Sequence, residues 1–387
     1  MIKSTLALVL AASAAIAGNT SAPIKVETKE KTLSEQFDNF GLLYKDKNNS
    51  VLQELWVLGR YHLHYHDTDG TLGNDSGWEH RRARFGFQAT LFENLTIHAQ
   101  AVSGADFDPV YNGFTELWAS WKFSDAVKLT IGQQKHRFTH DRNASSRYIN
   151  YMERSMFTNM FGLDYTPAVT LSGKVGKTEY YTGVFSNATD RNMSRAFGDY
   201  NSGWSYIAAA SYDLGGLFGA ESASIYASYI HSEADAEATN LNRFRDGVSA
   251  ALILTDGPAA LVTEVTGGFG SDRGSAVGIN IQPSYFLTDN LQLVGRYQLA
   301  LSDDEKGLTG QRRYERAAGA QPGNQYQAGY LGLNYYIAGH RAKLMTGVEY
   351  ADMDGESEVT AFAGVRIFFG PDSKGAFPTG KTLKGRW

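Results

Sequence analysis

Apolar and polar residues alternate over long segments of this chain, from about residue 50 to residue 369. In residues 95–103, for example, Leu95, Ile97 and Ala99 fall on one face of an extended chain, and Thr96 and His98 fall on the other. A period of two is the side-chain period of a β-strand. Segments of about ten residues are longer than the usual ~5–6 residues of strands in globular proteins. Long alternating strands are typical of transmembrane β-barrels, so the pattern predicts an all-β chain.

Sixteen strands can be placed along the sequence, with tight turns alternating with longer polar connections. The predicted strands span residues 52–66, 78–92, 95–104, 114–123, 126–134, 167–174, 178–187, 202–213, 221–232, 245–255, 259–268, 275–287, 290–302, 325–337, 341–351 and 357–369. Residues 213–220 are expected to form a longer turn. Outer-membrane barrels have an even number of strands, short periplasmic turns and long external loops. We therefore expect a transmembrane antiparallel β-barrel of about 16 strands. A soluble β-sandwich is the alternative, but a polar inner face would leave it too little core.

Aromatic residues cluster at the ends of the predicted strands. Trp121, Phe123 and Phe92 lie beside tight turns, and Phe368 and Phe369 close the last strand. Trp, Tyr and Phe form girdles at both interfaces of membrane barrels. We expect these residues to mark the periplasmic interface.

The amino terminus has the pattern of a secretory signal peptide. Lys3 is followed by an apolar stretch over residues 5–16, and Ala15-Ile16-Ala17 has the form of a cleavage site. No later stretch reaches the ~18 consecutive apolar residues of a membrane helix, so any membrane span would consist of β-strands. The sequence predicts a signal peptide (1–17), an N-terminal periplasmic segment (18–50), the barrel (51–369) and a C-terminal tail (370–387). The signal peptide leaves a soluble exported protein or an outer-membrane barrel, and the long alternating strands favour the outer membrane of a Gram-negative bacterium.

Composition and motifs argue against several other functions. The chain has no cysteine, which excludes disulfide scaffolds and thiolate metal centres, and its net charge of -5 argues against a nucleic-acid partner. No G-x-S-x-G, H-E-x-x-H, P-loop or EF-hand pattern occurs, so we expect neither an enzyme nor a cofactor. His62, His64 and His66 share one strand face and could bind a metal, but no matching carboxylate or cysteine spacing accompanies them. We interpret them as polar lumen residues and predict no metal site.

The longest connection, residues 135–166, is rich in cations. It carries Lys135, Arg137, Arg142, Arg147 and Arg154, together with several aromatic residues. Connections of about 30 residues are usually functional or disordered, and the aromatic content argues against a solvated tail. We expect this third external loop to fold into the barrel, where guanidinium groups lining a narrowed pore would favour anions over cations. The alternative is an external basic patch that faces lipopolysaccharide.

Further cations fall on the polar faces of neighbouring strands. In residues 78–92, alternation sends Phe85 and Phe87 outward and His80 inward together with two arginines. The wall residues predicted to line the pore and bind anions are Arg60, Arg82, Arg84, Lys128 and Arg366. Each could equally be a paired or solvated residue that keeps the lumen wet. Carboxylates such as Asp106, Asp108 and Glu116 could set a transverse field or pair with these cations.

Four segments carry a resemblance to a known family. They are Arg81-Arg82-Ala83-Arg84-Phe85-Gly86-Phe87, Leu129-Thr130-Ile131-Gly132-Gln133-Gln134-Lys135, Met152-Glu153-Arg154-Ser155 and Tyr181-Thr182-Gly183-Val184-Phe185-Ser186-Asn187. In order and approximate spacing they resemble the phosphate-selective porins of Gram-negative bacteria, the group of the O and P porins. The resemblance covers about the first half of the mature chain. It implies a sixteen-stranded barrel, usually a trimer, whose third external loop folds inward and whose arginines draw anions through.

These observations predict an outer-membrane porin for the passive diffusion of small hydrophilic solutes, with anions such as phosphate preferred. The expected partners are small anionic solutes, outer-membrane lipid and lipopolysaccharide, and two further copies of the chain in a homotrimer. A general porin without selectivity is the first alternative, because the chain is net acidic. A structural or adhesive barrel without transport is the second.

Overall fold

The computed structural model describes residues 33–104, 107–188, 203–233, 243–270, 272 and 274–371. The predicted signal peptide, the first part of the N-terminal segment and most of the C-terminal tail lie outside these residues. The strands of the wall are β2 (Leu52–Gly70), β3 (Asn74–Leu91), β4 (Leu95–Val102), β5 (Phe114–Lys122), β6 (Lys128–Lys135), β7 (Tyr165–Val175), β8 (Thr178–Ser186), β9 (Trp204–Leu217), β10 (Ala220–Ser232), β11 (Asp246–Asp256), β12 (Ala259–Phe269), β13 (Ala276–Phe286), β14 (Leu291–Ser302), β15 (Gln325–Tyr336), β16 (Ala342–Met353) and β17 (Glu356–Phe369). Three short helices and one short strand complete the described elements: α2 (Leu33–Asp38), β1 (Leu42–Lys45), α3 (His140–Asn143) and α4 (Met156–Met160).

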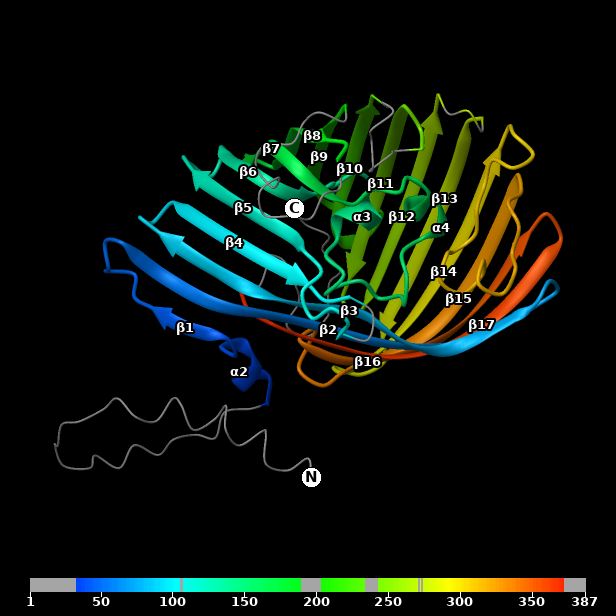
Figure 1. Ribbon diagram of the computed structural model, residues 1–387, viewed down its shortest axis with the longest axis horizontal. Coiled ribbons are helices and arrows are strands. Elements are labelled where there is room, and N and C mark those ends of the chain that lie inside the picture. The colour runs from blue at the N-terminus through cyan, green and yellow to red at the C-terminus, as the bar shows by residue number, and fades with distance from the viewer. Residues whose placement is uncertain are drawn as a thin grey trace. The chain divides into compact units, whose positions relative to one another are not determined.

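The sixteen strands β2–β17 form one closed antiparallel barrel. Each strand pairs with the next along the chain, and β17 pairs with β2, so the sheet returns to its first strand. Figure 1 shows these tilted strands side by side, with α3 and α4 on the concave side of the sheet. The predicted sixteen-stranded antiparallel barrel is therefore confirmed. None of the described helices is long and apolar enough to cross a membrane.

The two faces of the wall differ in the way that the alternation predicts. Large apolar side chains such as Phe87, Val248 and Leu331 are exposed on the outer face, where a membrane barrel contacts lipid. Polar residues such as Gln298 and Thr360 alternate with them and are buried on the inner face. The outer side chains therefore form the apolar surface that a bilayer requires.

The turn predicted over residues 213–220 differs in the structure. β9 continues to Leu217 and the turn is reduced to Phe218 and Gly219, both of which have positive φ angles. Glycine adopts this left-handed conformation without steric cost, which permits the short connection. The short strand β1 was not predicted; it pairs with Glu54–Trp56 of β2, next to the point where β17 ends.

A β-bulge in β3 changes the predicted faces of this strand. The pairing of β3 with β2 shifts between His62 and Leu63, so that Arg82 lies opposite His62 while His80 lies opposite Leu63. A bulge inserts one residue and moves the following side chains to the other face. His80 consequently contacts Tyr61 on the outer face instead of facing inward as predicted, with its Nδ1 2.6 Å from the tyrosine hydroxyl.

Most of the aromatic residues predicted at the turn-side interface are exposed there. Phe92, Trp121 and Phe123 expose 39–64% of their surface, as a girdle requires. Phe368 does not belong to this set, because it is buried beneath the guanidinium groups of Arg147 and Arg341. The ring next to the end of the last strand is therefore turned inward.

Candidate functional site

The connection between β6 and β7, residues 136–164, lies against the inner face of the barrel wall. It is the third connection at its rim, after those between β2 and β3 and between β4 and β5. Three buried cations of the wall donate hydrogen bonds to its backbone: Arg296 to Glu153 O at 2.8 Å, Lys343 to Ile149 O at 2.8 Å, and Arg366. We call Arg296, Lys343 and Arg366 the carbonyl clamp. Because helices and strands use most backbone carbonyls internally, an irregular loop offers acceptors that these cations can bind.

Arg366 makes the largest number of clamp contacts. Its guanidinium donates to the carbonyl oxygens of Ser146, Ile149, Tyr151 and Met152 at 3.3, 3.2, 2.8 and 2.7 Å. Its side chain is almost completely buried. The structure thus places this predicted anion-binding residue under the loop, where it orients the loop backbone.

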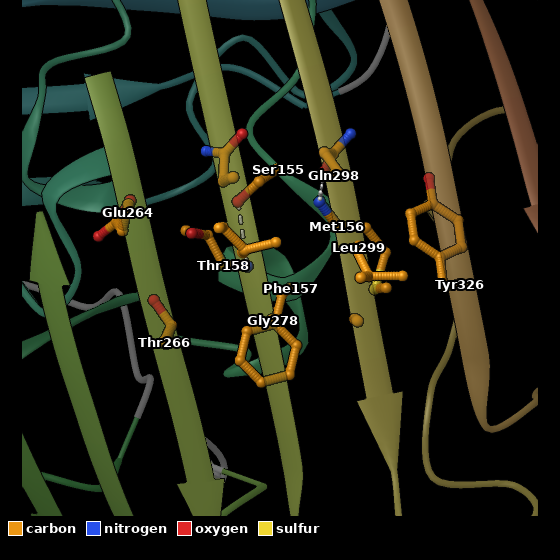
Figure 2. A pocket seen from close by; sticks show the side chains of 13 residues that line it. Ser155, Met156, Phe157, Thr158, Glu264, Thr266, Gly278, Gln298, Leu299 and Tyr326 are labelled. Atoms are coloured by element: carbon orange, nitrogen blue, oxygen red, sulfur yellow. Dashed lines mark hydrogen bonds between the residues drawn. The ribbon is translucent and has the colours of Figure 1, made fainter. Parts of the chain in front are cut away.

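The two short helices of the loop, α3 and α4, are attached to strands β12 and β14 of the wall. Glu264 of β12 accepts hydrogen bonds from the backbone N–H groups of His140 and Asp141 at the start of α3. Gln298 of β14 accepts from the backbone N–H of Met156, the first residue of α4, at 2.8 Å, as Figure 2 shows. A cavity of about 10 Å³, about the size of one water molecule, lies between α4 and strands β12–β15.

An apolar cluster fills the space between this loop and the inner wall on the side of β8–β16. Phe138, Phe157 and Phe161 from the loop pack together, with ring centroids 4.8 and 5.7 Å apart. The wall contributes apolar side chains to the same buried cluster, including Phe185, Ile207, Ile230, Ala276, Ala300 and Tyr326. Sequence reasoning did not predict an apolar inner wall here. Among the described residues, the tightly packed side chains of this cluster occupy the lumen on this side.

A cavity of about 530 Å³ lies on the opposite side, between the loop and strands β2–β6. Its charged lining consists of Arg60, Arg81, Arg82, Arg84, Lys128, Lys135, Arg137, Arg142, Arg147 and Arg154, with Glu116 and Asp164. Ten cations and two carboxylates line it, and Glu153 and Asp141 pair with Arg81 and Arg154 from behind the lining, which leaves an excess of six positive charges in a chain whose net charge is -5. We call this space the cationic cavity.

Several arginines of the cationic cavity are oriented by neutral partners. Arg60 donates to the Ser146 hydroxyl at 3.1 Å, and Arg84 donates to the Tyr165 hydroxyl at 2.9 Å. Arg142 lies over the ring of Tyr165, 5.8 Å from its centroid. Because these partners carry no negative charge, the guanidinium groups keep their full positive charge available to a passing anion.

A buried ion pair joins the loop to the cation-bearing wall. Arg81 donates to both carboxylate oxygens of Glu153, which lies in the loop. Burial alone would raise the pKa of Glu153, but the guanidinium groups of Arg81 and Arg82 hold it below its usual value. Glu153 is therefore charged at neutral pH and is occupied by Arg81, so it does not neutralise the other cations of the cavity.

Nine of the ten predicted site residues line the cationic cavity, and Arg366 is the exception. Sequence reasoning missed Arg81, which the bulge in β3 turns inward, and Tyr165, which begins β7 two residues before the predicted strand. Asp108 does not line the cavity, and Asp106 lies outside the described residues. Of the two predicted carboxylates that the structure describes, Glu116 faces the cations and Asp108 does not.

The histidines considered as a metal site have other contacts. The rings of His62 and His64 stack with centroids 6.1 Å apart, beside the clamp residue Arg366. His66 pairs with Asp75 at 2.7 Å. His62 and His64 thus contact each other beside Arg366 of β17, whereas His66 contacts Asp75 of β3.

Comparison with known proteins supports the sixteen-stranded barrel fold. Residues 57–215 match the family of phosphate-selective porins O and P, so the resemblance is confirmed over this part of the chain. No curated protein matches the chain at a significant level.

Solved structures of outer-membrane barrels share the fold at low sequence identity. An anion-selective porin from Comamonas acidovorans superposes with a TM-score of 0.57 at 14% identity, covering 81% of this chain and 99% of that chain. OmpT of Vibrio cholerae gives 0.56 at 13% identity, covering 84% and 100%. OmpF of Salmonella typhi, in complex with daunomycin, gives 0.57 at 10% identity, covering 84% and 100%. The family and the fold are those of channels rather than of enzymes, and they indicate the outer membrane of a Gram-negative bacterium.

Proposed function

We propose that this outer-membrane porin is a channel that prefers small hydrophilic anions, phosphate among them. The observation that carries the proposal is the excess of six positive charges around one cavity of about 530 Å³. The apolar cluster fills the other side of the loop, so solutes pass the arginines of the cationic cavity. In a narrow lumen the Coulomb energy between charges is larger than in bulk water, and this excess favours anions.

The long connections mark the external rim in this proposal. Seven connections at the other rim are short, such as Glu93-Asn94 and Gly257-Pro258, as expected for periplasmic turns. Anions therefore enter from the rim that carries residues 136–164 and 303–324. We further infer the homotrimer that the family resemblance implies, which the mass of the purified protein in detergent would check.

The reversal potential of single channels in a KCl gradient tests the anion preference. We expect a reversal potential close to the chloride equilibrium potential and a block of the chloride current by phosphate. Replacing both Arg84 and Arg147 with Ala should move the reversal potential toward zero and weaken the block. Arg245→Ala, which removes an exposed arginine at the rim, is the matched control and should change neither.

Other outcomes identify the alternatives. A reversal potential near zero in the wild type would indicate a general porin. Absence of channel steps together with firm binding to surfaces would indicate a structural or adhesive barrel. Either result would refute the proposed anion channel.

A further inference from the structure

The end of the last strand is turned away from the wall and into the cationic cavity. β17 pairs with β2 as far as Phe369, which lies opposite Gly59. Gly370 has a φ of +115°, a conformation that favours glycine, and the chain then reaches Pro371, which lines the cationic cavity. Proline has no backbone N–H to donate to a β-ladder. The sequence therefore favours an end of β17 at this point.

The N-terminal strand β1 takes the place on the wall that β17 leaves. Because β3 pairs with the other edge of β2 along almost its whole length, β1 lies on the same edge as β17. It pairs with Glu54–Trp56, and the backbone N–H of Val57 donates to Gly41 O at 2.7 Å, just beyond the last pair of β17. Phe40 packs edge-on against Phe369, with ring centroids 4.9 Å apart. The N-terminal segment thus occupies the edge to which a longer β17 would pair.

Arg341, in the turn between β15 and β16, holds the displaced chain end. Its Nη1 donates to Gly370 O at 3.0 Å, and its Nε donates to the Asp38 carboxylate at 3.2 Å. Its guanidinium also lies over the ring of Phe368, 5.5 Å from the centroid. Asp38 is the last residue of α2, so one buried arginine connects the N-terminal segment with the end of β17.

The displaced chain end contacts Arg147, one of the cations of the cationic cavity. Pro371 O accepts from Arg147 Nη1 at 3.1 Å, and the guanidinium lies over the ring of Phe368, 5.0 Å from its centroid. Its Nε donates to the Ser145 hydroxyl at 3.4 Å. None of the carboxylates that the structure describes forms an ion pair with Arg147, and no hydrogen bond between described residues uses its Nη2. Arg147 is thus oriented by neutral groups and keeps its charge and donors for a solute.

We propose that Arg341 and the N-terminal segment, α2 and β1, are positioning elements for Arg147. They keep the end of β17 off the wall, place the Pro371 carbonyl against Arg147, and so fix its guanidinium where anions pass. This inference rests on the proposed anion channel and adds residues outside the cavity that determine its affinity for anions. A long side chain that is already ordered loses less conformational entropy when it binds an anion. Loss of the positioning contacts should therefore weaken anion binding while every cation of the cavity remains.

Block of the chloride current by phosphate tests the proposal in two variants of the intact protein. Gly41→Val leaves all charges in place but should displace β1, because a Cβ atom at Gly41 would lie 2.5 Å from Val57 O and the φ of +92° disfavours valine. Arg341→Met removes the donor to Gly370. We expect each variant to raise the half-blocking concentration of phosphate about two- to tenfold, the cost of ordering one arginine side chain on binding.

Matched controls and a double-mutant cycle identify the residue through which the effect acts. Gly176→Val strains a turn glycine with a positive φ and open space around it, and Arg245→Met removes an exposed arginine at the rim; neither should change the block. Arg147→Ala channels keep the other cations of the cavity and should be blocked at a higher phosphate concentration. In this background Gly41→Val and Arg341→Met should have no further effect. A general weakening of the barrel would instead change the block in both backgrounds.

The outcomes separate this inference from the function on which it rests. Unchanged block in Gly41→Val and Arg341→Met, with anion selectivity intact in the wild type, would overturn the positioning role and leave the anion channel standing. Equal fold-changes with and without Arg147 would also overturn it. If Arg341→Met did not assemble, the block of Gly41→Val would decide. A wild type without anion selectivity would refute the proposed function itself, and this inference with it.

Discussion

Replacing Arg366 with Met should loosen the loop that bounds the cationic cavity. Its two short hydrogen bonds, to Tyr151 O at 2.8 Å and Met152 O at 2.7 Å, contribute most of the stabilisation. Hydrogen bonds to a charged group are each worth about 1.5–3 kcal/mol, so the variant loses about 3–6 kcal/mol of loop attachment. Since 1.4 kcal/mol corresponds to a factor of ten, the detached form of this segment should become about 10²–10⁴ times more populated.

Single-channel recording detects this change directly. The other clamp residues, Lys343 and Arg296, still hold the segment at Ile149 and Glu153, so the barrel should assemble. We expect a larger mean conductance, more open-channel noise and weaker anion selectivity, because Arg147 and Arg154 move with the loop. Arg366→Lys keeps the positive charge but has fewer hydrogen-bond donors. Its conductance, noise and anion selectivity should lie between those of the wild type and of Arg366→Met.

The opposite pattern would refute the reasoning. If Arg366→Met left the conductance and noise unchanged but abolished phosphate block, Arg366 would bind the anion itself, as the alternation along β17 predicted. Arg245→Met serves as the control for loss of an arginine elsewhere.

Three further predictions concern the rest of the lumen. Burial and the carboxylate of Glu349 raise the pKa of Glu315 to about 8, so its stabilising contribution is present at low pH and is lost as the pH rises through about 8. Tryptic cleavage within residues 303–324 should accelerate relative to Glu315→Gln as the pH rises toward about 8 and should level off above it, and equal profiles would contradict this. Phe161→Ala should destabilise the apolar cluster by about 3–5 kcal/mol, measured as a lower thermal unfolding temperature, and an unchanged temperature would show that the cluster contributes little. Because the chain has no cysteine, Gln88→Cys in the cationic cavity should react with an anionic thiol reagent while Thr266→Cys beside α4 should not, and equal labelling would place an open passage on both sides.

Alternation along the strands was sufficient to predict the barrel, because one membrane-facing and one lumen-facing side impose a period of two on every strand. It failed at Arg81 and His80, where a bulge shifts the period by one residue. A bulge depends on how two strands pair, and nothing in the local sequence of β3 marks the position of the extra residue.

The sequence was sufficient to predict which residues line the cationic cavity, but not which contacts these residues make. Charged residues on a polar strand face and in one long loop identify the candidates, since both reach the lumen. Which of them remain open to solutes depends on contacts between distant segments. Arg366 is the clearest case, because its partners lie 214–220 residues earlier in the chain. Glu116 shows the converse, since only the structure reveals that it lines the cavity while Asp108 does not.

The carbonyl clamp also constrains the order in which the barrel can assemble. Its cations come from β14, β16 and β17, whereas the loop that they hold lies between β6 and β7. The seam between β2 and β17 joins residues nearly 300 positions apart, such as Thr68 and Thr360, whose separation is 292. Contacts of such long range form late, after shorter loops have closed. The strand pairing that closes the wall and the hydrogen bonds that attach the loop therefore both depend on the last strands of the chain.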